Sequence, residues 1–391
     1  MMPAPLDLAV VRSGSGVLDL LPRLARALEG DAPLLPYAAG SPPPTLPPGS
    51  GRGLPSEIAL VVGTSGSTGS PKLAMLGREA ILASADATHH RLGGPGQWFL
   101  PLPAQHIAGM QVLFRSLRAG TTPVVMDLRD GFTPAGFVAA ARRMTGERRY
   151  TSLVPTQLAR LLEERTAVPA LREFHGVLVG GAATSPQLLQ RARAQGIAVS
   201  TTYGMSETAG GCVYDGLPLQ GVSVRADDDA RVHLAGPVLA SGYLGLPELT
   251  AQAFVEHDGR RWFRTDDLGR RDKQGRWHVV GRADDLINTG GLKVAPRLVE
   301  EAVAAHLPGV RECVVVGVTD PEWGQVVGAA VVMVSGQPAL ALEQVRAELR
   351  GLLPDHALPR RVLALDRLPT RGPGKPDRRA VQALLAATKS T

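Results

Sequence analysis

Short apolar segments alternate with segments of helical periodicity from residue 58 to residue 202, and no other feature constrains the fold as strongly. The expected strands are short apolar runs, at residues 58–62, 98–102, 123–126, 150–154, 177–179 and 199–202. The expected helices lie between them, at residues 78–92, 107–117, 134–144, 156–165 and 186–194. Because parallel strands need a crossover connection, usually a helix, this order predicts an α/β fold with a mostly parallel sheet covered by helices on both faces.

Different patterns flank this region on both sides. Residues 17–28 have the periodicity of an amphipathic helix, and residues 40–53, GSPPPTLPPGSGRG, form a connector without regular structure. From residue 222 to residue 281 the helical pattern is absent, and short strands with turns dominate. This stretch therefore predicts a small β subdomain.

A separate α+β unit is expected at the C-terminal end of the chain. Its predicted elements are a helix from residue 296 to 306, strands at 313–318 and 327–334, a helix at 340–353 and a C-terminal helix. The pattern changes near residues 281–285. We therefore expect a large N-terminal domain over residues 1–283 and a small C-terminal domain over residues 284–391.

Composition excludes several functional classes. Two cysteines, Cys212 and Cys313, exclude a disulfide scaffold and a cysteine-based metal site. No apolar run reaches the roughly 18–20 residues of a membrane span, and the N-terminus does not resemble a secretion signal. We therefore expect a cytoplasmic protein that is not inserted into a membrane. The net charge of +6 is spread among interspersed acidic residues, which argues against a nucleic-acid partner and suits small anionic ligands.

A glycine-rich loop directly after the first buried strand is the most informative motif. It reads Gly63-Thr-Ser-Gly-Ser-Thr-Gly-Ser-Pro-Lys72, and Lys72 is one of only five lysines among 42 basic residues. Glycines allow close backbone approach, while hydroxyl and N–H groups can surround phosphate oxygens. The spacing matches neither a Walker loop nor a Rossmann fingerprint. It predicts a different kind of phosphate-binding loop.

Five motifs occur in one order along residues 58–380 and together resemble the adenylate-forming (AMP-binding) superfamily of acyl-CoA synthetases, peptide-synthetase adenylation domains and luciferases. They are the loop above, Thr202-Tyr-Gly-Met-Ser-Glu-Thr208, Phe263-Arg-Thr-Asp-Asp-Leu-Gly269, Gly281-Arg-Ala-Asp-Asp-Leu-Ile287 and Gly372-Pro-Gly-Lys375. The resemblance implies that the C-terminal domain is a mobile lid. It also implies ATP and Mg²⁺ as cofactors, CoA as co-substrate, and an acyl-adenylate as intermediate.

The resemblance assigns a nucleotide site to the N-terminal domain. Phosphate contacts are implied for Thr64, Ser65, Gly66, Ser67, Thr68, Gly69 and Lys72, and adenine-side contacts for Gly180, Gly181, Ala182, Tyr203, Gly204 and Met205. Glu207 would hold Mg²⁺, and Thr208 would contact the α-phosphate. A carboxylate suits Mg²⁺ because the ion is hard and prefers oxygen ligands. A core position for Tyr203 is the simpler alternative.

Further roles are implied nearer the C-terminus. Asp267 would bind the ribose hydroxyls with help from Arg282, although the chain has Thr-Asp-Asp where the family usually has Thr-Gly-Asp, so that Asp266 is a competitor. A turn-capping role for both aspartates is the alternative. Asp284 matches the hinge of the family.

The lysine loop and a glycine pair complete the set. Lys375 would bridge the acyl carboxylate and the α-phosphate, unless it is a hydrated surface lysine. Gly290, Gly291 and Lys293 would lie on the CoA side, and Lys293 contacts either CoA or solvent.

The acyl group is the last point that the sequence addresses. By the same resemblance His106 lines the acyl pocket together with Gly204, and Arg115, on the helix that follows His106, would pair with a second substrate carboxylate. The alternative is an exposed Arg115. The short chain and the blocks at residues 150–157, 178–184 and 210–216 look like actinobacterial o-succinylbenzoate–CoA ligases of menaquinone biosynthesis.

Other functions stay open at this stage. They are an aryl- or fatty-acid–CoA ligase, a stand-alone adenylation enzyme that loads a carrier-protein thiol, and a non-catalytic nucleotide-binding module. The expected partners are therefore ATP, CoA and an aromatic carboxylic acid. The sequence leaves homo-oligomerisation open.

Overall fold

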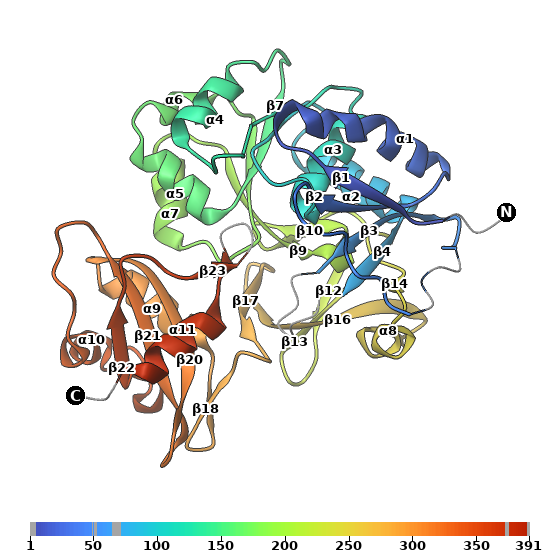
Figure 1. Ribbon diagram of the computed structural model, residues 1–391. Coiled ribbons are helices and arrows are strands. Elements are labelled where there is room, and N and C mark those ends of the chain that lie inside the picture. The colour runs from blue at the N-terminus through green and yellow to red at the C-terminus, as the bar shows by residue number, and fades with distance from the viewer. Residues whose placement is uncertain (1–4, 49, 51–52, 65–71, 372–374, 389–391) are drawn as a thin grey trace. The chain divides into compact units, whose positions relative to one another are not determined.

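The computed structural model describes residues 5–48, 50, 53–64, 72–371 and 375–388 (Figure 1). The chain divides into two compact units. The first comprises Met1–Arg225 and His233–Thr265, and the second comprises Ala226–Val232 and Asp266–Thr391. The expected domain boundary between residues 283 and 284 lies inside the second unit, and the position of the functional hinge stays a prediction.

The first unit contains a seven-stranded sheet that matches the expected parallel sheet in its central part. Its order is β11-β10-β9-β8-β7-β5-β6, and the strands from β9 to β6 run parallel. The bounds are β5 (Gln97–Leu100), β6 (Val124–Val125), β7 (Arg149–Leu153), β8 (Gly176–Val179), β9 (Val199–Met205), β10 (Gly210–Tyr214) and β11 (Leu217–Pro218). Together with the flanking helices, this confirms the expected α/β class.

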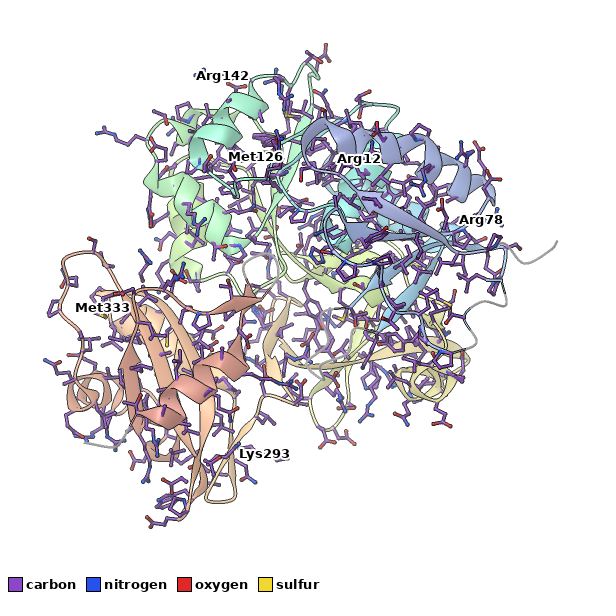
Figure 2. All side chains as sticks on the ribbon, in the orientation of Figure 1. Arg12, Arg78, Met126, Arg142, Lys293 and Met333 are labelled. Carbon is purple, nitrogen blue, oxygen red and sulfur yellow. The ribbon has the colours of Figure 1, made fainter. Side chains whose placement is uncertain are left out.

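Helices pack on the sheets of this unit, as Figure 1 shows for the group α4 to α7. Their bounds are α1 (Leu21–Glu29), α2 (Arg78–Arg91), α3 (Ile107–Arg118), α4 (Pro134–Ala141), α5 (Pro155–Glu163), α6 (Ala167–Arg172), α7 (Pro186–Ala194) and α8 (Pro247–Ala253). Phe99 of β5, Phe137 of α4 and Phe174 form an aromatic centre between helices and sheet, with Met126 in the same core (Figure 2).

A second, five-stranded sheet of the first unit has the order β1-β2-β3-β4-β14. Its strands are β1 (Asp7–Val11), β2 (Leu34–Ala38), β3 (Ile58–Gly63), β4 (Leu73–Gly77) and β14 (Gly242–Tyr243). The sequence analysis missed β1, β2 and β4. The expected helix at 17–28 is a 3₁₀ turn, Gly14–Leu20, followed by α1, which ends where Gly30 adopts φ 107°.

The expectation of a helix-free stretch from residue 222 to 281 is wrong, because α8 lies within it. None of the residues of α8 is buried, so this helix carries no apolar stripe that a sequence pattern could reveal. Pro247 and the acidic Glu248 in its first turn are local helix signals.

The long strand β16 (Arg260–Arg271) serves both units. Its first half pairs with β15 (Phe254–His257) in the first unit, and its second half pairs with β17 (Trp277–Arg282) in the second unit. The strands β12 (Ser223–Ala226) and β13 (Arg231–Ala235) belong to the same sheet.

The second unit contains the helices and strands expected for the C-terminal α+β unit, together with residues 226–232 and 266–283. Its main strands β20 (Val310–Asp320) and β21 (Gly324–Met333) form a long antiparallel pair, with α9 (Pro296–His306), α10 (Leu342–Leu349) and α11 (Arg378–Ala387) around it. The remaining elements are β18 (Ile287–Thr289), β19 (Leu292–Val294), the 3₁₀ turn Asp355–Ala357, β22 (Arg361–Ala364), β23 (Thr370–Arg371) and β24 (Lys375–Pro376). Valines and leucines make up most of the core on both faces of the sheet.

Candidate active site

The predicted phosphate loop connects the two strands of a β-hairpin. Gly63 at the end of β3 is paired with Leu73 at the start of β4, and the Thr64 N–H donates to the Lys72 carbonyl at 2.8 Å. Thr64 and Lys72 therefore lie side by side at the base of the loop. The other predicted phosphate ligands, Ser65, Gly66, Ser67, Thr68 and Gly69, lie outside the described residues.

The second nucleotide motif lies against the base of this loop. It continues β9 into a 3₁₀ turn, Ser206–Thr208, and the Ser206 hydroxyl donates to the Gly63 carbonyl at 3.2 Å. The turn then reverses at Ala209, which has φ 49°. That backbone is strained for a residue with a side chain, and its carbonyl is held by Ser84 at 2.9 Å and Gln111 at 2.7 Å.

Glu207, the predicted Mg²⁺ ligand, is a buried carboxylate with 7% of its surface exposed. Its Oε1 accepts a hydrogen bond from the Tyr243 hydroxyl at 2.8 Å, and its carbonyl accepts from the Ala240 N–H at 2.8 Å. The Lys72 ammonium lies 5.4 Å from the centre of the Tyr243 ring. Lys72 thus contacts the ring of Tyr243, and Glu207 contacts its hydroxyl. The sequence analysis did not identify Tyr243 as part of the site.

The donor set around Glu207 fits Mg²⁺ bound with phosphates and water. Within the described ranges no group of three or more His, Cys, Asp or Glu residues could hold a metal by itself. Mg²⁺ is commonly held by one or two carboxylates together with substrate phosphates, rather than in an all-protein cage. A single buried carboxylate beside the base of the predicted phosphate loop suits this kind of binding.

The Thr208 side chain hydrogen-bonds the backbone of its own turn, which the sequence motif did not predict. It is fully buried, its hydroxyl oxygen accepts from the Met205 N–H at 3.0 Å, and the hydroxyl lies 2.8 Å from the Gly210 carbonyl, to which it donates. These bonds stabilise the turn that carries Glu207. The expected contact of Thr208 with the α-phosphate stays a prediction.

The adenine-side residues lie at the carboxyl ends of neighbouring parallel strands. Val179 of β8 is paired with Thr201 of β9, so that Gly180 and Tyr203 follow at one edge of the sheet. A side chain at Gly180 would collide with the Thr202 hydroxyl, and one at Gly204 would collide with the Gly210 carbonyl. Ligands bind at this edge in open α/β sheets, so the position suits the predicted contacts.

The other predicted adenine-side residues are less buried or lie in a bend of the chain. Gly181 has φ 79°, Ala182 is exposed, and Tyr203 and Met205 are half-buried. The alternative that Tyr203 is a core residue is therefore not what the structure shows.

Arg115 is buried, with 3% of its surface exposed, so the alternative of an exposed Arg115 is wrong. Its guanidinium stacks 4.9 Å from the Trp98 ring centre and its Nη2 lies 3.4 Å from the Tyr214 hydroxyl. Its Nε has no hydrogen-bond partner, and no carboxylate of the described residues pairs with it. Burial lowers the pKa of Arg115. The neighbouring Arg118 is the exposed one and pairs with Asp86.

Two histidines lie on or next to the helices α2 and α3: His89 in α2 and His106 directly before α3. His106 directly precedes α3 and is half-buried, and its place in the acyl pocket stays a prediction. His89 is buried in α2, where its Nε2 accepts from the Trp98 indole at 3.3 Å. Burial, and then the charge of Arg115, lower the pKa of His89 to about 4. A neutral His89 avoids a second buried cation beside Arg115.

In the second unit, the structure separates the two candidate aspartates. The side chain of Asp267 is 11% exposed and its Oδ1 lies 3.3 Å from Arg282. The Asp266 side chain is 48% exposed and pairs with Arg231 and, at 3.6 Å, also with Arg282. Arg282 also donates two hydrogen bonds to the Asp284 carboxylate, each of 2.8 Å. The exposed Asp284 is therefore tied to the strand that precedes it.

Lys375 begins the short strand β24, where its backbone pairs with Arg371. Residues 372–374 lie outside the described residues. Gly290 and Gly291 form the turn between β18 and β19, at φ 57° and 82°, and the Trp323 ring leaves no room for a side chain at Gly290. Lys293 is exposed on β19 (Figure 2).

The sequence of the chain is similar to those of AMP-binding enzymes. The family model of the AMP-binding enzyme matches residues 23–243, and that of the AMP-binding enzyme C-terminal domain matches residues 298–375. The chain is 44% identical to the probable 2-succinylbenzoate–CoA ligase of Mycobacterium tuberculosis, over 95% of this chain and 96% of that protein. It is 32% identical to a feruloyl-CoA synthase of Amycolatopsis, over 95% of this chain and 79% of that protein.

A solved structure agrees in fold. The o-succinylbenzoate CoA synthetase of Bacillus subtilis, in complex with its acyl-adenylate intermediate, superimposes with a TM-score of 0.75 at 22% identity, over 100% of this chain and 90% of that chain. At this identity the likeness concerns the fold alone.

The buried His89 predicts a pH dependence of stability. Its pKa is about 4 in the folded chain and near 6.5 when unfolded, so between these values the unfolded chain binds more protons. Stability therefore falls as the pH falls through this window, by up to about 1.4 kcal/mol per pH unit. Urea unfolding between pH 4.5 and 6.5 measures the slope. His89→Gln removes this part of the slope, and the exposed neighbour variant His90→Gln retains it; equal slopes in all three proteins contradict the assignment.

Proposed function

The chain belongs to the AMP-binding enzyme family, and we propose that it is an ATP-dependent o-succinylbenzoate–CoA ligase. The choice of o-succinylbenzoate as substrate is supported by the 44% identity to the mycobacterial ligase over nearly the full length of both chains. In the proposed reaction, a carboxylate oxygen attacks the α-phosphate of ATP and pyrophosphate leaves. The thiol of CoA then attacks the acyl carbon, and AMP leaves. The product is a thioester for menaquinone biosynthesis, made in the cytoplasm.

The first half-reaction brings two anions together, so cationic groups must balance the charge that builds up. Lys72 and the loop at residues 64–69 are proposed to surround the β- and γ-phosphates. Glu207 would hold Mg²⁺, which supplies positive charge to the phosphates when bound. Tyr203 would stack on adenine beside Gly180, Gly181 and Ala182, and the backbone of Gly204 and Met205 would approach the nucleotide.

Residues of the second unit are proposed to complete the chemistry. Asp267 would accept hydrogen bonds from the ribose hydroxyls, which its burial and its pairing with Arg282 support. Lys375 would bridge the acyl carboxylate and the α-phosphate. Asp284 would act as the hinge between the half-reactions, and Gly290, Gly291 and Lys293 would lie toward CoA in the second.

The acyl site is proposed to contain His106 and Arg115. A buried guanidinium that lacks a carboxylate partner in the described part of the chain supports this role, because burying an uncompensated charge costs stability. o-Succinylbenzoate carries an aromatic carboxylate besides the succinyl carboxylate that becomes activated. That second carboxylate would supply the missing partner of Arg115.

An aryl-CoA ligase is the second candidate, favoured by the 32% identity to feruloyl-CoA synthase. Pyrophosphate release, measured with o-succinylbenzoate, ferulate, benzoate and a medium-chain fatty acid, separates the candidates. We expect CoA-dependent turnover with o-succinylbenzoate alone. Turnover with only one of the other acids would contradict the proposed substrate, and release that ignores CoA would indicate a carrier-protein acceptor.

Arg115→Met is expected to abolish recognition of the aromatic carboxylate. A matched substrate is 4-oxo-4-phenylbutanoate, which is o-succinylbenzoate without that group. The wild type should prefer o-succinylbenzoate, and the variant should lose about two orders of magnitude or more in kcat/KM for it, since a buried charge pair is worth roughly 2–5 kcal/mol. Activity with the smaller acid should change little.

Two controls accompany this variant. Arg118→Met, which removes an exposed arginine of the same helix, should keep the preference. The melting temperature of Arg115→Met should not fall, because the lost charge has no carboxylate partner in the described residues. A variant that keeps the substrate preference would show that Arg115 does not contact the acid.

Lys375→Ala should separate the two half-reactions. We expect adenylate formation to fall by several orders of magnitude, because the transition state loses a cation between two anions. Thioester formation from supplied acyl-adenylate should be largely spared. Single-turnover assays of each half-reaction measure both rates, with Lys273→Ala, which removes an exposed lysine, as the control. Equal loss in both half-reactions would rule out the proposed role.

A further inference from the structure

Tyr243 contacts two ionisable side chains of the candidate site, Glu207 and Lys72. It lies outside the five motifs on which the candidate site was predicted. Its hydroxyl donates to Glu207 Oε1 at 2.8 Å, and its ring centre lies 5.4 Å from the Lys72 ammonium. Both Tyr243 and Glu207 are buried, with 4% and 7% of their surfaces exposed. The contact therefore forms away from bulk water, where a charge-assisted hydrogen bond is strong.

The Tyr243 side chain is itself held firmly. Its strand β14 pairs with β4, so that Tyr243 lies opposite Ala74, two residues after Lys72. Its N–H donates to the Thr250 hydroxyl at 2.9 Å, and its ring packs against Phe254 with 5.8 Å between ring centres. The hydroxyl is thus presented from a fixed position.

Glu207 needs such a partner because its chain segment is irregular. It lies in a single 3₁₀ turn between β9 and the strained Ala209. The Ala240 N–H fixes its backbone carbonyl, and Tyr243 fixes its carboxylate. A carboxylate has about four acceptor positions, so a hydrogen bond to one oxygen leaves capacity to ligate a metal ion.

Mg²⁺ tolerates little deviation from octahedral geometry, so the direction of a ligating carboxylate matters. Groups that hydrogen-bond a metal ligand orient it, and their loss typically weakens metal affinity about 10–100-fold. We propose that Tyr243 is a positioning residue for metal-dependent nucleotide binding, which it supports by orienting Glu207 and by placing its ring against Lys72. This rests on the proposed function only in that Glu207 is taken as the metal ligand; the acyl substrate does not enter.

The test measures metal binding rather than turnover. Mn²⁺ replaces Mg²⁺ as a paramagnetic probe, and α,β-methylene-ATP replaces ATP because its α–β bridge resists cleavage. Electron paramagnetic resonance of the full chain, without acyl acid or CoA, gives the Kd of Mn²⁺ in the ternary complex. Tyr243→Phe, which removes one hydroxyl and keeps the ring, should raise this Kd about tenfold.

Tyr150→Phe is the matched control. Tyr150 is another fully buried tyrosine of the first unit, and its hydroxyl bonds the carbonyls of Leu92 and Gly94 at 3.0 and 2.9 Å. This variant should lose thermal stability and keep the wild-type Kd of Mn²⁺. A loss of metal affinity that merely follows loss of stability would appear in both variants and would overturn the proposal.

A double-mutant cycle with Glu207→Gln shows whether Tyr243 acts through Glu207. The hydroxyl should matter little once the carboxylate is gone, so Tyr243→Phe should have almost no effect in the Glu207→Gln background. Additive effects, or a Tyr243→Phe variant within twofold of the wild-type Kd, contradict the proposal and leave the proposed function standing. A wild-type chain that binds no Mn²⁺ with the nucleotide contradicts both.

Discussion

Three hydrogen bonds around the Ser206–Thr208 turn hold the first unit's part of the candidate site together. Ser206 bonds the end of β3, the Glu207 carbonyl accepts from Ala240, and the Glu207 carboxylate accepts from Tyr243. These bonds join segments that lie far apart in the sequence. They place a buried carboxylate beside the base of the glycine-rich loop, next to Lys72 and Tyr243, which strand pairing of β4 with β3 and β14 holds in place.

The second constraint is the burial of charge. Arg115 is held in the interior by an aromatic ring and a tyrosine hydroxyl, which stabilise a guanidinium less than a carboxylate would. Burial, and then the charge of Arg115, lower the pKa of His89 to about 4, so that His89 is neutral at physiological pH. The buried charge of Arg115 lowers the free energy of unfolding of the free protein. The carboxylate of the proposed acid would restore this stability only when the acid is bound.

Five of the six expected strands form the parallel part of the seven-stranded sheet, because short apolar runs between helices have few other solutions. The expected strand at residues 58–62 lies instead in the five-stranded sheet, as β3. The strands β1 and β2 were missed since residues 5–48 contain prolines, one of them inside β2, and α8 was missed since it buries nothing. Motif order indicated which segments to inspect for the candidate site, and the roles of their residues stay predictions.

What the motifs could not supply were contacts between distant residues. Tyr243 bonds a residue 36 positions earlier, and only the fold reveals this. Likewise Asp266 and Asp267 are adjacent in sequence and both pair with Arg282, and only the fold reveals that Asp267 is the more buried of the two. The exposed alternative for Arg115 was equally open until its burial was known.

The central claim is that the succinyl carboxylate of o-succinylbenzoate attacks the α-phosphate of ATP. Isotope transfer tests this directly, because the attacking oxygen stays on AMP when CoA displaces it. With oxygen-18 in the succinyl carboxylate, the account predicts AMP that carries one labelled oxygen; with the label in the aromatic carboxylate, it predicts unlabelled AMP. Unlabelled AMP from the first substrate, or formation of ADP and phosphate instead of AMP, would contradict it.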